Sequence, residues 1–114
     1  MSAITTHVLD VSIGRPAAGV LVTLHRQTND GLWEPIGSKK TDGDGRARDL
    51  IPEGESLMKA VHRLTFDVGQ YFNDRQIDGF YQEVVIPFKV NDASQHYHVP
   101  LLLSPFGYST YRGS

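Results

Sequence analysis

The chain contains the run His96-Tyr-His-Val-Pro-Leu-Leu-Leu-Ser-Pro-Phe-Gly-Tyr-Ser-Thr-Tyr-Arg-Gly-Ser114, which joins an apolar strand pattern to reactive side chains. Side chains alternate between the two faces of a β-strand, so every second residue shares a face. One face here carries only bulky core groups, namely Tyr97, Val99, Leu101 and Leu103. The other face mixes imidazoles with apolar groups, namely His96, His98, Pro100, Leu102 and Ser104. We expect this second face to be covered by another chain or by a ligand.

Short alternating apolar segments, separated by Gly, Pro, Asn and Asp, recur along the chain and predict an all-β sandwich of seven or eight strands. A short helix is expected over 68–73, capped by Asp67 with Gln70 in capping-box position. Strands 7–13 and 19–26 are expected to be neighbours. The predicted strands are 7–13, 19–26, one containing Trp33 and Ile36, one starting at Arg46, 58–66, 83–90 and 97–103. Their predicted inward side chains include Val20, Val22, Leu24, Leu64 and Phe66.

The size and composition narrow the possible function classes. With 114 residues, 39% of them hydrophobic, the chain is expected to form a single domain over 1–114. It contains no cysteine, which excludes disulfides, thiolate catalysis and cysteine-ligated metals. A net charge of −2 without a basic stripe argues against nucleic acid as a partner. No run of about 18 apolar residues and no signal-like start is visible, so we expect no membrane association and a cytosolic location.

The histidines are the first candidates for chemistry. His96 and His98 project from the same face and could chelate a metal, but no Asp or Glu in the strand offers a third ligand. Exposure of both rings to solvent is an alternative. Acid–base chemistry is favoured because imidazole is close to balance between its two forms at neutral pH and the strand is otherwise apolar. His7 shares a strand face with Leu9, so an imidazole again lies beside an aliphatic side chain, as His98 does beside Leu102. His25 and His62 are expected to be structural or solvated.

Arg46 follows a turn sequence, Thr41-Asp-Gly-Asp-Gly45. The acidic residues resemble a calcium loop, but alignment on Gly45 places the first ligand position on Lys40 and the last on Ile51, so a tight turn is predicted. An arginine beside a glycine can bind a planar urea, imide or carboxylate through two parallel donors. A lone arginine is more often a surface charge, and Tyr111 and Arg112 are similarly ambiguous when taken singly.

Taken together, several motifs closely resemble the 5-hydroxyisourate hydrolase family, the transthyretin-like enzymes of purine and urate breakdown. The resemblance runs the full length of the chain. The ending Tyr-Arg-Gly-Ser is its most specific element, because hormone-carrying transthyretins share the fold and the Leu-Leu-Ser-Pro run but lack that ending and the histidines. The motifs are Thr6-His-Val-Leu-Asp10, Gly14-Arg-Pro16, Gly43-Asp-Gly-Arg46, the run from His96 to Pro105, and Tyr111-Arg-Gly-Ser114.

The resemblance implies a transthyretin-like β-sandwich of two four-stranded sheets with one short helix, assembled as a homotetramer around a central channel. It also implies hydrolytic opening of the six-membered ring of 5-hydroxyisourate, which gives 2-oxo-4-hydroxy-4-carboxy-5-ureidoimidazoline. No metal and no organic cofactor is expected for this reaction. The partners expected are this small-molecule substrate and other copies of the chain.

The family's catalytic residues correspond to His7, Arg46 and His98, and its substrate-binding residues to His7, Arg46, Tyr111 and Ser114, with Pro100 and Leu102 as channel wall. Water is the expected nucleophile, because there is no cysteine and no serine with a visible base partner. One histidine would take a proton from water while the other orients or returns it, and the sequence leaves open which does which. Arg46 would hold the substrate and offset developing negative charge.

Two other function classes remain. A transthyretin-like carrier of small aromatic ligands would favour short or apolar groups where this chain has His7, Arg46, His98 and Tyr111. A structural β-sandwich interaction module would have no evident use for paired imidazoles and the polar ending.

Overall fold

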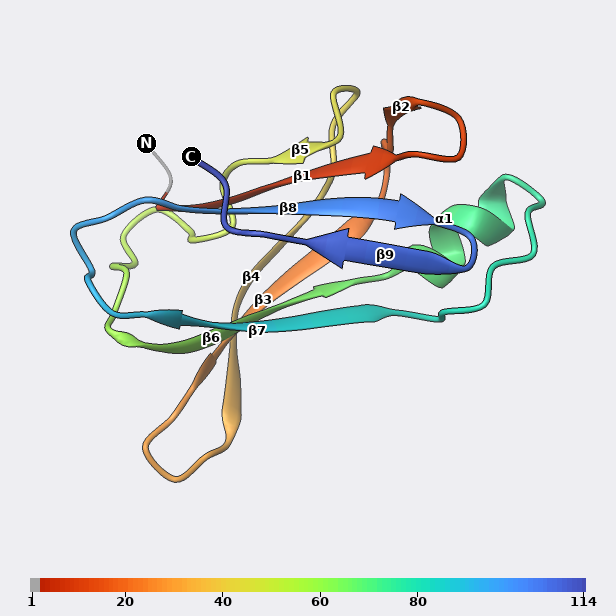
Figure 1. The fold of residues 1–114 in the computed structure, drawn as a ribbon. Coiled ribbons are helices and arrows are strands. Elements are labelled where there is room, and N and C mark those ends of the chain that lie inside the picture. Colours follow the sequence, from red (N-terminus) through yellow and green to blue (C-terminus); the bar gives the residue numbers. More distant parts are fainter. Residues whose placement is uncertain (1–2) are drawn as a thin grey trace.

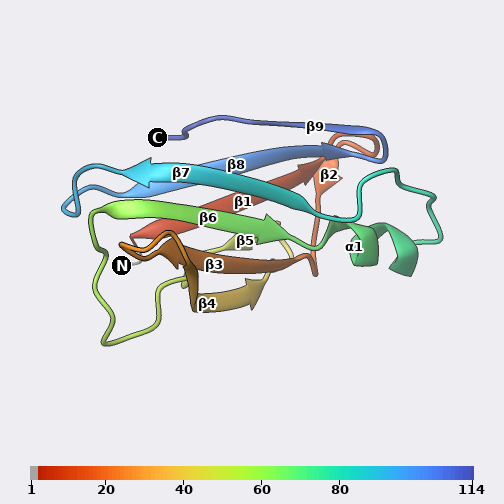
Figure 2. The ribbon, with the colours of Figure 1, turned by 90° about the horizontal axis from the view of Figure 1, so that it is seen from below.

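The computed structural model describes residues 3–114, which form two β-sheets packed face to face and one short helix (Figures 1 and 2). The first sheet has the order β2 (Arg15–Pro16), β1 (Ile4–Asp10), β8 (Tyr97–Ser104), β9 (Gly107–Thr110), with β5 (Arg46–Ala47) also paired to β1. The second sheet has the order β4 (Trp33–Lys40), β3 (Leu21–Gln27), β6 (Ala60–Phe66), β7 (Val84–Val90). Helix α1 spans Val68–Asp74. The predicted sandwich is confirmed, although the first sheet has five strands rather than four because β5 joins β1.

The core lies between the sheets and contains the side chains that the alternation placed inward. Tyr97, Val99, Leu101 and Leu103 of β8 are each no more than 6% exposed. From the second sheet and its entry, Val20, Val22, Leu24, Leu64 and Phe66 are fully buried. Removing apolar surface from water is the main stabilising contribution to such a sandwich. The predicted core faces are therefore confirmed.

The strand predicted at 7–13 was misplaced. It spans Ile4–Asp10, and the residues after Asp10 form a turn. The Asp10 carboxylate accepts hydrogen bonds from the backbone N–H and the hydroxyl of Ser12. The backbone carbonyl of Asp10 accepts one from Ile13 N–H. These local bonds compete with strand pairing, as is usual for aspartate, and they end the strand despite the alternating pattern that continues beyond it.

The expected pairing of the first two long strands was wrong as well. β1 and β2 belong to the first sheet and β3 to the second, so the chain crosses between the sheets over residues 17–20. Ala17 and Val20 are fully buried along this crossing. The two apolar strands face each other across the core instead of pairing side by side, and the main partner of β1 is β8, in parallel.

Helix α1 begins where its cap was predicted. The Asp67 carboxylate accepts a hydrogen bond from Gln70 N–H at 3.2 Å. The reciprocal half of a capping box is not formed, because the Gln70 side chain donates to Asp74 and Asp67 N–H donates to Leu21 O. No helix within residues 3–114 is long and apolar enough to cross a membrane.

Candidate active site

The two histidine strands predicted from the sequence lie side by side. β1 and β8 pair in parallel, with Thr5 opposite His98 and His7 opposite Pro100. The neighbours of His7 in β1, Thr6 and Val8, are fully buried, so His7 projects from the outer face of the first sheet, as does His98 between buried Tyr97 and Val99. The parallel register therefore brings both imidazoles to one surface.

A tight turn presents Arg46 to the same surface. The Asp42 carboxylate accepts hydrogen bonds from the N–H groups of Asp44 and Arg46, at 2.9 and 3.0 Å, and the Arg46 bond is the main reason that the pKa of Asp42 is lowered. Gly45 has a φ of 76°, and a Cβ there would lie 2.3 Å from the Val8 carbonyl oxygen. Glycine lets the turn press against β1. Arg46 consequently lies opposite His7.

The C-terminal residues continue β9 along the edge of β8. Gly113 N–H donates to His98 O at 2.8 Å, and a Cβ on Gly113 would lie 2.6 Å from Cδ2 of His98 and 3.1 Å from Cγ of Pro100. Pro100, which we expected another chain or a ligand to cover, is already buried within this chain. The close approach of Gly113 shows that the tail contributes to this cover, and it carries Ser114 toward the histidines.

A pocket of about 400 Å³ opens where these segments meet. Of the predicted site residues, Arg46, His98 and Ser114 line it, and His7 lies directly beside Arg46. Tyr111 is 58% exposed and lines a separate hollow with Ile86 and Phe88, so it is not brought to this pocket. The full lining is Thr5, Thr6, Arg46, Arg48, Asp49, His96, His98 and Ser114.

Sequence reasoning missed Thr5 and Arg48. Each lies two positions from a predicted site residue, Thr5 from His7 and Arg48 from Arg46. The alternation of side chains along a strand could have suggested both.

Each of the three histidine rings has a polar partner through one of its nitrogens. His98 Nδ1 lies 2.8 Å from the Thr5 hydroxyl oxygen, and His96 Nε2 lies 2.9 Å from the same oxygen. His7 Nε2 lies 2.8 Å from the Asp44 carbonyl oxygen. Because a carbonyl oxygen only accepts, His7 Nε2 carries a hydrogen and its Nδ1 is the basic nitrogen of the neutral ring.

The pKa of His98 is lowered, first by burial and then by the positive charge of Arg46, with smaller effects from His96 and His7. Burial and nearby cations both disfavour the charged imidazolium. A neutral imidazole is the form that can accept a proton, so His98 is suited to act as a base at neutral pH.

Within residues 3–114, no three His, Asp or Glu side chains come together in a metal-binding arrangement. The rings of His96 and His98 stack with their centroids 6.3 Å apart, and both face Thr5.

The remaining histidines and the larger hollow lie elsewhere. His25 and His62 belong to the second sheet. His62 is 1% exposed and its ring lies beside that of Phe88, which agrees with a structural role.

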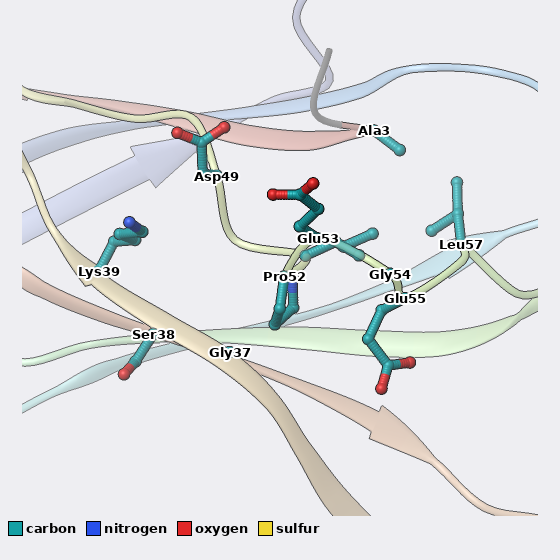
Figure 3. A pocket seen from close by; sticks show the side chains of 11 residues that line it. Ala3, Gly37, Ser38, Lys39, Asp49, Pro52, Glu53, Gly54, Glu55 and Leu57 are labelled. Carbon is teal, nitrogen blue, oxygen red and sulfur yellow. The ribbon is translucent and has the colours of Figure 1, made fainter.

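A hollow of about 840 Å³ lies between β4 and the segment after β5. Figure 3 shows the carboxylates of Asp49, Glu53 and Glu55 around it, and its lining contains no histidine. The candidate chemistry therefore belongs to the smaller pocket.

A transthyretin-like sandwich whose first sheet carries histidines and an arginine on its outer face defines the class of this protein. The chain belongs to the HIUase/Transthyretin family, whose profile matches residues 4–113. It is 45% identical to the 5-hydroxyisourate hydrolase of Caulobacter vibrioides, over 100% of both chains.

Two solved structures show the same fold. The 5-hydroxyisourate hydrolase of Klebsiella pneumoniae superimposes with a TM-score of 0.86 at 33% identity, over 100% of both chains. The transthyretin of Sparus aurata superimposes with a TM-score of 0.92 at 30% identity, over 99% of this chain and 97% of that one. The fold alone therefore does not separate a hydrolase from a carrier.

Proposed function

We propose that this chain is a 5-hydroxyisourate hydrolase of purine breakdown, with residues 1–114 forming a single hydrolase domain. The observation that carries the proposal is the convergence of Arg46, His98 and Ser114 on one pocket, with His7 beside them. The 45% identical relative bears that activity in its name. The reaction adds the elements of water across a carbon–nitrogen bond of the six-membered ring, giving 2-oxo-4-hydroxy-4-carboxy-5-ureidoimidazoline.

His98 is the proposed general base. Its Nδ1 faces Thr5, and no hydrogen-bond partner for its Nε2 is found among the described residues, so Nε2 is available to a water molecule. As the water oxygen bonds to the ring carbonyl carbon, Nε2 takes the water proton. The ring carbon–nitrogen bond then breaks, and the leaving nitrogen receives a proton. His7 is proposed to orient the reacting groups or to return that proton.

Arg46 is proposed to bind the substrate. Its planar guanidinium offers several N–H donors to the carbonyl groups of the substrate and offsets the negative charge that develops on the attacked carbonyl oxygen. Ser114 closes the pocket beside it. The substrate-binding role expected of Tyr111 stays a prediction, since its side chain lies outside this pocket.

A homotetramer is part of the proposal. Large apolar side chains remain exposed at the turns that adjoin the first sheet, including Val11 at 54%, Ile13 at 51% and Phe106 at 72%. Exposed apolar groups of this size favour association of identical chains. Light scattering at micromolar concentration should report four copies, and a monomer would contradict this part of the proposal.

The cytosolic location expected from the sequence stays a prediction, which fractionation of cells would test.

A turnover assay tests the function directly. Freshly made 5-hydroxyisourate decays spontaneously, and the protein should accelerate the loss of its absorbance well above that rate. A carrier would bind a small aromatic ligand stoichiometrically without accelerating the decay, and an interaction module would do neither. No acceleration at micromolar protein would overturn the proposed function.

A further inference from the structure

A single hydroxyl group joins two histidines at the pocket. Thr5 Oγ1 lies 2.8 Å from His98 Nδ1 and 2.9 Å from His96 Nε2, although these residues are 93 and 91 positions away in the sequence. Thr5, His96 and His98 all line the pocket. The contact depends on the parallel pairing of β1 with β8, which sets Thr5 directly opposite His98.

Counting hydrogens restricts how these three groups can be arranged. A threonine hydroxyl has one hydrogen to donate and can accept two hydrogen bonds. If Thr5 donates to His96 Nε2, then His98 Nδ1 must carry a hydrogen and donate to Thr5. If Thr5 donates to His98 Nδ1, then His96 Nε2 must carry the hydrogen. With both rings neutral, the tautomer of one histidine therefore fixes that of the other.

The two arrangements leave different chemistry in the pocket. In the first, His98 Nε2 has a free lone pair and can take a proton from water. In the second, Nε2 carries a hydrogen and cannot act as a base. The guanidinium of Arg46 lines the same pocket and affects His98 electrostatically. Nδ1 is engaged by Thr5, so Nε2 is the ring nitrogen without a partner among the described residues. A cation in the same pocket favours a lone pair on Nε2 over an N–H group, so the electrostatics favour the first arrangement.

We propose that Thr5 is a positioning residue for the hydrolysis. Its hydroxyl accepts a hydrogen bond from His98 Nδ1, which holds His98 in the tautomer with hydrogen on Nδ1, and donates a hydrogen bond to His96 Nε2. The inference rests on the proposed function, in which His98 is the base. Thr5 acts through His98, much as a hydrogen-bonding partner fixes the tautomer of an imidazole ligand or base in other sites. A replacement that keeps the shape of Thr5 but removes the hydroxyl should release this control.

Nuclear magnetic resonance tests the tautomer without any substrate. Long-range ¹⁵N–¹H spectra of histidine-labelled protein at pH 8 should show His98 with hydrogen on Nδ1, the signal being assigned from its loss in His98→Gln. The Thr5→Val variant should show a mixture of tautomers. Hydrogen on Nε2 in the parent, or an unchanged tautomer in Thr5→Val, would overturn the inference.

Kinetics supply the second readout. Thr5→Val should lower kcat about 10-fold with little change in KM, since a net hydrogen bond is ordinarily worth a factor of a few to about ten and the tautomer affects the chemical step. Thr5→Ser restores the hydroxyl and should return kcat to within about 2-fold of the parent. Thr23→Val is a matched control, because Thr23 is also a half-buried strand threonine on an outer face but lies in the second sheet.

The outcomes separate this inference from the function on which it rests. Parental kcat in Thr5→Val, or a Thr5→Ser variant as impaired as Thr5→Val, would overturn the role of Thr5 even if the parent is active. A parent that does not hydrolyse 5-hydroxyisourate would overturn the proposed function. The tautomer spectra of the parent and of Thr5→Val would then still decide whether Thr5 fixes the His98 ring.

Discussion

Replacing Gly113 with alanine should damage the site while leaving the fold intact. The added Cβ would lie 2.6 Å from His98 Cδ2, whereas ordinary contacts of this kind begin at 3.4 Å. The difference, 3.4 − 2.6 = 0.8 Å, is the least by which the ring or the tail must move. Pro100, 3.1 Å from the same Cβ, limits movement on its own side.

A displacement of this size should lower the rate of the catalysed reaction strongly. A misplacement of about 1 Å in a reacting geometry can cost about 10²-fold in rate, so we expect kcat/KM for 5-hydroxyisourate to fall by about that factor. The free energy of unfolding should change by about 1 kcal/mol or less, because the added methyl group lies on the C-terminal tail at the surface and opens no cavity in the core. Initial rates corrected for spontaneous decay measure the first quantity, and urea unfolding measures the second.

Gly107→Ala is the matched control. Gly107 also lies on the C-terminal segment, in β9, but a Cβ there would meet nothing closer than the Ser104 hydroxyl oxygen at 3.8 Å. Its activity should stay within about 2-fold of the parent, as for a surface substitution without new contacts. A folded Gly113→Ala protein with parental kcat/KM would refute the argument that the tail and the His98 ring are held in one close-packed arrangement.

Four further predictions follow from the same structure. His98→Ala should lower the catalysed rate by about 10²- to 10⁴-fold, whereas His25→Ala, in the second sheet, should leave it nearly unchanged. In the parent, kcat/KM should fall on the acid side with a midpoint below 6.5, because burial and Arg46 lower the pKa of His98 and the protonated ring cannot act as a base; a midpoint above 6.5 would contradict this. His62 has a lowered pKa because it is buried, so its unfolded form binds a proton more readily, and the stability it contributes at pH above 6.5 should be lost as pH falls through the folded pKa. Urea unfolding between pH 7.5 and 5 should therefore depend less on pH in His62→Leu. Tyr71→Phe should destabilise by about 1–3 kcal/mol, because it removes the hydroxyl that donates to the buried Asp10 carboxylate, and an unchanged urea midpoint would contradict this.

Features set by neighbouring residues could be predicted from the sequence. The inward face of β8 follows from the period of two in Tyr97, Val99, Leu101 and Leu103, since a strand buried on one side must place its large apolar groups there. The start of α1 follows from Asp67, whose carboxylate reaches the N–H three residues ahead. In each case the physical cause acts over a few residues, so the sequence pattern records it directly.

Strand pairing and the contacts that depend on it were decided by the tertiary structure. The alternation in residues 4–13 is compatible with pairing to β3, but burying Ala17 and Val20 carries the chain across to the second sheet and leaves β1 to pair with β8. The sequence marked His7, Arg46 and His98 as candidates one at a time. Their convergence, and the position of Thr5 between two histidines more than 90 residues away, come from a parallel register that is fixed by packing the whole core and not by any local pattern.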